Sequence, residues 1–229
     1  MTASTDTLIP HRSLAVSCQA RADNPLHGPA FMAAMAQAAE QGGAIALRAN
    51  GPADIAAIRA VSRLPIIGIL KRWDDRFPVY ITPDFASAVA IAAAGADIIA
   101  LDATARARDG EPLDQLIARI RDELGKPVFA DCATLEDGVR AAALGASYIA
   151  TTLSGYTPET EARKALGPDI ALIEALAKAV SVPIVAEGRF EQPEQMELAF
   201  TAGAHAVVVG TAITNPREIT RRFARHVGA

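Results

Sequence analysis

The stretch AVAIAAAGADIIALDA (Ala88 to Ala103) joins an alanine-rich helical pattern to a short apolar run through a single glycine. Glycine just past the end of a helix supplies the left-handed backbone that terminates it. The short, unbroken apolar run that follows is typical of a strand in a parallel sheet. This stretch therefore predicts a helix that leads directly into a buried strand.

The same junction recurs along the chain in two forms. In the first, the helix ends at Gly-Ala or an equivalent pair, as in GVRAAALGASYIATT and MELAFTAGAHAVVVGTA. In the second, the helix ends at proline, as in LIARIRDELGKPVFAD, because proline blocks further helix but tolerates the start of a strand. These junctions predict eight strands, LAVSC, AIALR, PIIGILK, DIIALDA, PVFADC, YIATT, PIVAEG and AVVVGTA, with seven helices between them and an eighth at ITNPREITRRFARHV.

Eight such units in 229 residues predict a single (β/α)8 TIM barrel with eight parallel strands. A doubly wound open sheet is the alternative, but it rarely repeats so evenly through eight units. No linker or shift in composition divides the chain, so we expect one domain over residues 1–229. Within it, we expect residues 1–12 to form an N-terminal segment and residues 213–229 to form a C-terminal helix.

The composition argues against several classes of protein. Hydrophobic residues make up 51% of the chain, and the net charge of -4, with no long basic cluster, argues against a nucleic-acid partner. No apolar run is long enough to span a membrane and no signal peptide is recognisable, so we expect no membrane partner and a cytoplasmic location. In that reducing compartment, Cys18 and Cys132 are expected to stay unpaired.

Polar side chains gather at the carboxyl ends of the predicted strands, whereas the amino ends carry glycine, alanine and proline. In a (β/α)8 barrel, the carboxyl ends of the strands form the catalytic face. The simpler interpretation for the two aspartates in this set is that they cap helices or anchor loops. The residues at these ends are Gln19, Arg48, Lys71, Asp102, Asp131, Thr151–Thr152, Glu187 and Gly210–Thr211.

Lys71 ends the apolar run PIIGIL and is one of only four lysines in the chain. Burial can pull the pKa of a lysine toward neutrality, whereas an arginine stays charged. The simpler interpretation is an ion pair with Asp74 or Asp75. We favour a proton-transfer role, because a lysine that emerges from a buried strand stands in the mouth of the barrel.

Two glycine-bearing loops, AEGRFEQPEQ and VVGTAITNP, follow the last two strands. Loops at these places commonly hold a phosphate with backbone N–H groups, so Gly188, Gly210 and Thr211 are candidates for this role, with Arg189 adding charge. The glycines could instead serve only the turns. We also expect the hydroxyl of Tyr156 to reach the site. No Walker or dinucleotide pattern and no metal-ligand spacing is present, so we expect neither a cofactor nor a metal.

A lysine, a glutamate, an arginine and a phosphate-binding loop in one barrel mouth suggest proton transfer on a phosphorylated carbonyl compound. Lys71 would act as the base when neutral, with Glu187 as a second acid–base group. Two alternatives remain open, a barrel aldolase in which Lys71 forms a Schiff base and a non-catalytic sugar-phosphate sensor. A binding module has no need of a proton-transfer pair, which argues against the sensor.

A family resemblance runs through most of the chain. The motifs VSCQA, ALRANGPADI, IIGILKR, VYITP, GADIIALDAT, FADCATLEDG, TTLSGYT, VAEGR and VVVGTAIT together resemble the N-acetylmannosamine-6-phosphate 2-epimerases across roughly residues 13–227. The resemblance implies an isomerase that interconverts N-acetylmannosamine-6-phosphate and N-acetylglucosamine-6-phosphate by removing and returning the proton at C2, without a cofactor. It also implies a role in amino sugar (sialic acid) catabolism and a homodimer that involves the C-terminal helix.

Matched motif by motif, the resemblance assigns the proton-transferring role to Lys71 and the role of its acidic partner to Glu187. Gln19, Arg48 and Asp131 match substrate-binding or supporting groups. An isomerase acting on a phosphosugar of amino-acid biosynthesis would fit the phosphate loops equally well, but it lacks the full set of motifs.

The sequence departs from the family pattern after the last strand. Where the family commonly has ITRP, this chain has ITNP, which places Asn215 at the position of the arginine. Arg217 lies two residues further on and is the candidate to compensate.

Overall fold

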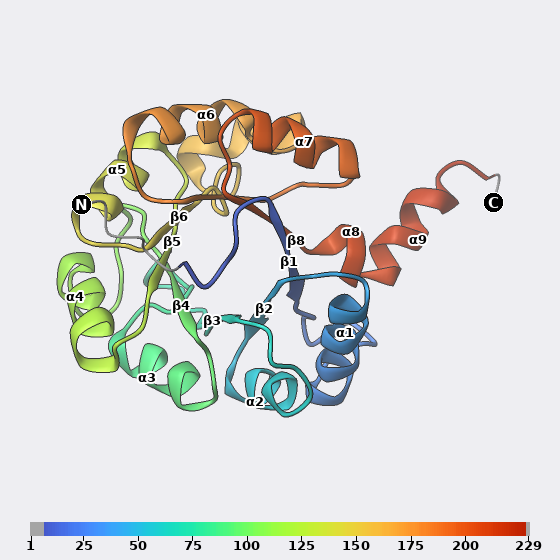
Figure 1. Cartoon of the computed structure of the whole chain (residues 1–229), viewed down its shortest axis with the longest axis horizontal. Helices are drawn as coiled ribbons and strands as arrows, with labels where there is room; N and C mark the ends of the chain where they lie inside the picture. The colour runs from blue at the N-terminus through green and yellow to red at the C-terminus, as the bar shows by residue number, and fades with distance from the viewer. Residues whose placement is uncertain (1–6, 228–229) are drawn as a thin grey trace.

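Eight parallel strands close into a barrel in chain order within residues 7–227, the part of the chain that the computed structural model describes (Figure 1). The last strand pairs with the first, so no sheet edge remains open. The prediction of a (β/α)8 barrel is confirmed, and the open sheet is excluded. The strands are β1 Ser13–Cys18, β2 Ala46–Asn50, β3 Ile66–Ile69, β4 Ile98–Asp102, β5 Val128–Asp131, β6 Tyr148–Ala150, β7 Ile184–Glu187 and β8 Ala206–Val209.

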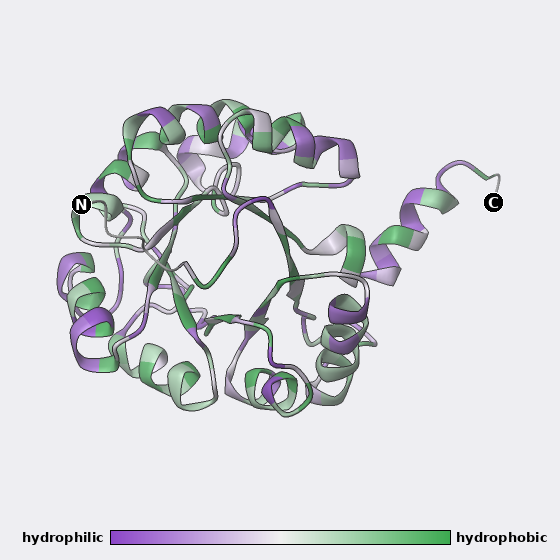
Figure 2. Ribbon diagram, viewed as in Figure 1, coloured by the Kyte–Doolittle hydropathy of each residue, from purple (hydrophilic) through white to green (hydrophobic). Residues whose placement is uncertain are grey.

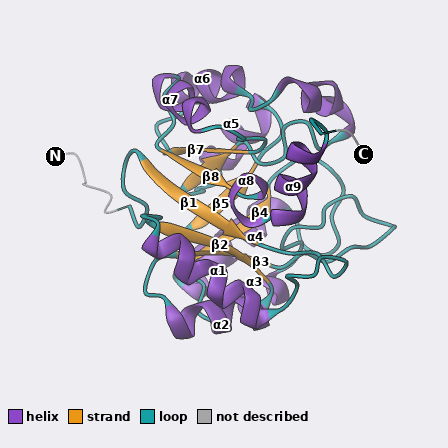
Figure 3. Ribbon diagram, turned by 90° about the vertical axis from the view of Figure 1, so that its right-hand side faces the viewer, coloured by secondary structure: helices purple, strands orange, loops and turns teal. Residues whose placement is uncertain are grey.

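The helices surround the barrel, except for the last one, which lies outside the ring (Figures 1 and 3). A 3-10 helix, Pro158–Leu166, fills the connection after β6. The α-helices are α1 Pro29–Gln41, α2 Pro52–Val61, α3 Phe85–Ala93, α4 Leu113–Leu124, α5 Leu135–Ala143, α6 Ile170–Ala179, α7 Pro193–Thr201, α8 Thr211–Thr214 and α9 Pro216–Ala224.

The Gly-Ala junctions behave as the sequence predicts. After α3, the chain turns into β4 through Gly95, which has a φ of 108°. Residues with a side chain rarely adopt this backbone, so glycine is the residue that allows the helix to stop and the strand to start within four positions. The same turn recurs at Gly145 before β6, with a φ of 96°.

The alternation of side chains along each strand divides the apolar residues into two cores. Residues that face outward, such as Leu47, pack under the helices, whereas residues that face inward, such as Ala46, fill the barrel interior. Figure 2 shows the hydrophobic strands enclosed by helices that carry both hydrophobic and hydrophilic residues. Because successive residues of a strand point to opposite faces, Arg48 and Asn50 share the inward face with Ala46.

The amino-terminal end of the barrel is closed by the segment that precedes β1. Ile9 is fully buried in the interior cluster, and its carbonyl oxygen lies 2.7 Å from Nε2 of His205. Its N–H group donates to the hydroxyl of Tyr148 at 3.4 Å. Residues 7–12 therefore cap the barrel, while residues 1–6 of the expected N-terminal segment lie outside the described residues.

The C-terminal segment forms two helices where the sequence suggested one from residue 213. Asn215 separates α8 from α9 with φ -123° and ψ 80°. The break has a local cause, because the ring of Pro216 disfavours helical backbone at the residue before it. Residues 228–229 of the expected helix lie outside the described residues.

Candidate functional site

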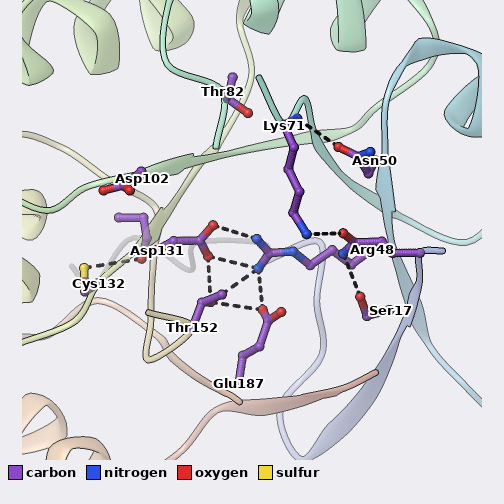
Figure 4. Close-up of polar contacts among 12 residues, drawn as sticks. Ser17, Arg48, Asn50, Lys71, Thr82, Asp102, Asp131, Cys132, Thr152 and Glu187 are labelled. Atoms are coloured by element: carbon purple, nitrogen blue, oxygen red, sulfur yellow. Dashed lines mark hydrogen bonds and ion pairs between the residues drawn. The ribbon is translucent and has the colours of Figure 1, made fainter. Parts of the chain in front are cut away.

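Arg48 lies at the centre of a buried polar network at the carboxyl end of the barrel (Figure 4). Its side chain is only 1% exposed. Nη1 and Nη2 donate to the two carboxylate oxygens of Asp131 at 2.9 and 2.6 Å, and Nη1 also donates to Glu187. Burial would lower the pKa of Arg48, but the two carboxylates raise it on balance. The arginine is therefore a fixed cation that orients both acids.

Glu187 ends β7 beside a second carboxylate. Its side chain is 13% exposed, and the Thr152 hydroxyl lies 3.1 Å from its Oε2 and 2.7 Å from Oδ1 of Asp131. Burial raises the pKa of Glu187, Asp131 raises it further, and Arg48 opposes the shift. The raised pKa lets this carboxyl group hold a proton more readily than an ordinary glutamate does, as a proton donor must.

Lys71 follows β3 and turns its side chain into the barrel mouth, toward Arg48 (Figure 4). Its Nζ donates to Oε1 of Gln19 at 2.9 Å, and Nε2 of Gln19 donates to Ser17 Oγ at 2.8 Å. Burial, together with the charge of Arg48, lowers the pKa of Lys71 to about 8, although Glu187 opposes this shift. A substantial share of this lysine is thus neutral near physiological pH.

The interpretation of Lys71 as a surface ion pair is wrong. Within residues 7–227, Lys71 forms no ion pair, and the carboxylate of Asp74 is bound instead by Arg76 at 2.6 Å. The backbone N–H of Lys71 donates to Oδ1 of Asn50 at 2.9 Å, which fixes the start of its side chain.

The two aspartates at the ends of β4 and β5 have different surroundings. Asp131 is fully buried and points into the network of Arg48, while Thr134 caps α5, as the sequence suggested. The carboxylate of Asp102 accepts from the backbone and the hydroxyl of Thr104, at 2.9 and 2.6 Å, and from Arg106. Asp102 therefore anchors the loop after β4.

Arg189 and Tyr156 come together in the loops after β7 and β6. The guanidinium of Arg189 donates to the carbonyl oxygens of Ser154 and Gly167 and lies 5.6 Å from the centroid of the Tyr156 ring. Arg189 has a left-handed φ of 61°, directly after Gly188 at 112°. Neither side chain is hydrogen-bonded to the network of Arg48 among the described residues. The pair therefore links the loops after β6 and β7 to each other.

Gly210 and Thr211 lie where β8 leads into α8. Gly210 precedes the helix, its carbonyl oxygen accepts from the N–H groups of Ile213 and Thr214, and Thr211 is exposed. They face the same end of the barrel as the loop of Gly188, because both loops follow the carboxyl ends of neighbouring strands.

Asn215, which departs from the family pattern, has structural contacts. Its Oδ1 accepts from the N–H of Glu218 at 3.4 Å, which caps α9, and from Nδ2 of Asn24 at 3.3 Å. Arg217 donates to the carbonyl oxygen and the carboxylate of Asp23, at 3.0 and 3.1 Å. These contacts tie the C-terminal segment to the loop after β1.

Sequence reasoning missed Ser17, Asn50 and Tyr80 as residues of the site. Ser17 lies two residues before Gln19, and Asn50 two residues after Arg48. A period of two along each strand would have found both, because it places them on the inward face. Tyr80 stands in the long connection after β3, where no strand period applies.

The two cysteines lie in the interior of the fold. Cys18 and Cys132 are both buried and unpaired, and burial raises the pKa of both thiols, to about 12 for Cys18. Both side chains therefore fill the interior as small buried groups. Among residues 7–227, no helix is both long and apolar enough to cross a membrane, and no group of metal-ligating side chains gathers.

The matching family model and the related proteins carry almost the same description. Residues 32–229 match the family described as "Putative N-acetylmannosamine-6-phosphate epimerase". A protein of Thermosynechococcus vestitus named "Putative N-acetylmannosamine-6-phosphate 2-epimerase" is 55% identical over 88% of this chain and 87% of its own length. A protein of the same name from Caldanaerobacter subterraneus is 50% identical over 92% of this chain and 89% of its own length.

The solved structures agree with the sequence comparisons. The N-acetylmannosamine-6-phosphate 2-epimerase of Clostridium perfringens superposes with a TM-score of 0.91 and 43% identity, covering 96% of this chain and 95% of that one. A thiamine phosphate pyrophosphorylase from Pyrococcus furiosus gives a TM-score of 0.61 at 14% identity, covering 91% of this chain and 90% of that one, which shows a shared fold alone.

Proposed function

This chain belongs to the N-acetylmannosamine-6-phosphate epimerase family, and from that premise we propose that it interconverts N-acetylmannosamine-6-phosphate and N-acetylglucosamine-6-phosphate. The observation that carries the proposal is the position of Lys71. Its Nζ lies in the barrel mouth with a lowered pKa of about 8, beside two carboxylates that one buried arginine holds in place. Such a group can remove a proton next to a carbonyl without a cofactor.

The proposed reaction passes through the open-chain aldehyde of the sugar, in which the carbonyl at C1 makes the C2 proton acidic. The neutral amine of Lys71 takes this proton, and the C2–H electrons move into the enolate. Glu187, whose pKa is raised, returns a proton to C2. Figure 4 shows Lys71 and Glu187 reaching toward Arg48 from opposite sides, which supports one group for each face of the flat intermediate.

Binding of the substrate is assigned to the remaining residues of the mouth. Gln19, Arg48 and Asp131 would contact the sugar, since all three belong to hydrogen-bonded chains that reach Lys71 or Glu187. The phosphate would lie at the loops after β7 and β8. The groups proposed to line that phosphate site are Tyr156, Gly188, Arg189, Gly210 and Thr211.

The experiment that tests the function is proton NMR of N-acetylmannosamine-6-phosphate in heavy water with the enzyme. We expect the C2 proton signal to disappear while the gluco epimer grows. Borohydride treatment in the presence of substrate should trap no covalent adduct, whereas an aldolase that uses a Schiff base would be trapped. Absence of both exchange and product would refute the epimerase assignment for this substrate.

The pH dependence follows from the lowered pKa of Lys71. Because the reaction needs the neutral amine of Lys71 and the protonated carboxyl group of Glu187 together, kcat/KM should follow a bell-shaped profile, with each limb changing about tenfold per pH unit. Initial rates from pH 6 to 10, in the direction from manno to gluco, would measure this. A profile that does not fall on its acid side would contradict the neutral amine of Lys71 as the base.

We also propose a homodimer in which α9 forms the contact. This helix lies outside the barrel and contains no buried residue, and its Phe223 side chain is 76% exposed (Figure 1). Light scattering should give twice the chain mass of 23.9 kDa, and Phe223→Glu should halve it. A wild-type protein that is monomeric at micromolar concentration would contradict this proposal.

A cytoplasmic role in the catabolism of amino sugars, including those from sialic acid, completes the proposal. The two buried, unpaired cysteines support a reducing compartment, where thiols persist.

A further inference from the structure

The connection after β3 folds back on itself as a short antiparallel pair beside the catalytic lysine. The N–H of Arg72 donates to the carbonyl oxygen of Tyr80 at 2.8 Å, and the N–H of Thr82 donates to that of Leu70 at 2.9 Å. Lys71 and Ile81 are bridge partners between these two bonds. The segment that carries Tyr80 is thereby held next to the lysine of the proposed reaction.

The ring of Tyr80 is held on two sides. Trp73 stacks on it with ring centroids 3.9 Å apart and an interplanar angle of 16°. Tyr80 also packs against the inward-facing cluster of the barrel, to which Ile81 belongs. Burial raises the pKa of the Tyr80 hydroxyl, and Asp131 and Asp102 raise it further, so the phenol lies within electrostatic reach of the network around Arg48.

The hydroxyl of Tyr80 has no hydrogen-bond partner among residues 7–227. The hydroxyl oxygen is not fully buried, so it stays accessible and can donate to a ligand. The ring cannot turn away easily, because both Trp73 and the interior cluster hold it. Tyr80 therefore presents a pre-oriented hydroxyl beside an apolar surface.

The proposed substrate carries one group that can use both a hydroxyl donor and an apolar surface. Its acetamido group is attached to C2, the atom that Lys71 must reach, and consists of an apolar methyl and an accepting carbonyl oxygen. Three polar residues near Lys71 are already hydrogen-bonded: Gln19, Arg48 and Glu187. The segment paired with Lys71 supplies its bridge partner Ile81 and, one residue earlier, Tyr80 with Trp73 stacked on its ring. This segment offers an apolar surface together with a donor that has no partner within residues 7–227.

We propose that Tyr80, held by Trp73, recognises the acetamido group of the substrate and so selects for N-acylated sugars. The ring provides the apolar contact for the methyl group, and the hydroxyl donates to the acetamido oxygen. This inference rests on the proposed function, since it takes the position of C2 from the role of Lys71. It assigns Tyr80 to substrate positioning and selection, with the proton transfer left to Lys71 and Glu187.

Two non-reacting, open-chain ligands test the proposal by calorimetry. N-acetylglucosaminitol 6-phosphate carries the acetamido group, and sorbitol 6-phosphate carries a hydroxyl in its place. The ratio of their dissociation constants measures recognition of the acetamido group. We expect Tyr80→Phe to reduce this ratio by about 3- to 10-fold, the range for one hydrogen bond. Trp73→Ala should reduce it in the same direction, and because Trp73 is 66% exposed, this variant should keep the fold.

Tyr148→Phe is the matched control, because it removes a hydroxyl from the opposite end of the same barrel. It should leave the ratio unchanged. An unchanged ratio in Tyr80→Phe and Trp73→Ala, or an equal loss of affinity for both ligands, would overturn the inference. The wild-type exchange experiment separates the two proposals: if the wild type exchanges the C2 proton and these variants keep full selectivity, the acetamido assignment fails alone.

Discussion

Replacement of Lys71 by alanine is expected to lower kcat for epimerisation by about 10²- to 10⁴-fold, the range for loss of a positioned general base. The fold should be unaffected. The side chain of Lys71 makes one hydrogen bond, to Gln19, and its removal leaves no buried charge without a partner. Loss of the C2 proton in heavy water, followed by NMR beside a thermal melt, would measure both effects.

Two further variants make this result specific. Lys178 lies on α6, exposed and paired with Glu174, so Lys178→Ala should retain full activity. Lys71→Arg keeps the positive charge but cannot supply a neutral base, and we expect it to be as inactive as the alanine variant. Retention of exchange in Lys71→Arg would show that the lysine acts through its charge, and retention in Lys71→Ala would remove it from the reaction.

The fold could be predicted from the sequence because its signals are local. The glycine turn before β4 and the proline before β5 each mark a helix end and a strand start within a few residues. Repeated seven times, such junctions leave few topologies other than a closed barrel. The break at Asn215 was missed, although the proline after it carries the necessary signal.

The residues of the site could be predicted from the sequence, but the hydrogen bonds and ion pairs between them could not. The sequence placed Arg48, Asp131 and Glu187 at strand ends, yet the arginine contacts partners that are 83 and 139 residues away. These contacts cross the barrel and depend on the inward face and register of three different strands. The contacts of Arg189 with two backbone carbonyls likewise could not be predicted, because they join irregular loops for which sequence gives no period.

Arg48→Met is expected to destabilise the protein by about 3 to 5 kcal/mol, the range for removing one partner of a buried ion pair. Methionine fills much of the volume of the arginine side chain, so the loss of stability reflects mainly the loss of the positive charge. Without the guanidinium, Asp131 and Glu187 face each other in a buried setting with no cation between them. Urea unfolding followed by circular dichroism would measure the difference.

The sign of the pH dependence shows whether the destabilisation comes from the lost positive charge or from lost packing. Without Arg48, which opposes the raised pKa of Glu187, this pKa should rise further above its unfolded value, so that unfolding releases more protons as the pH increases. The stability deficit of Arg48→Met should therefore be larger at pH 8 than at pH 5, where protonation relieves the repulsion. Adding Glu187→Gln removes one of the two charges and should restore part of the stability lost at pH 8. A deficit that is equal at both pH values, with no recovery in the double variant, would show that Arg48 stabilises the barrel by filling space and not by holding the two acids.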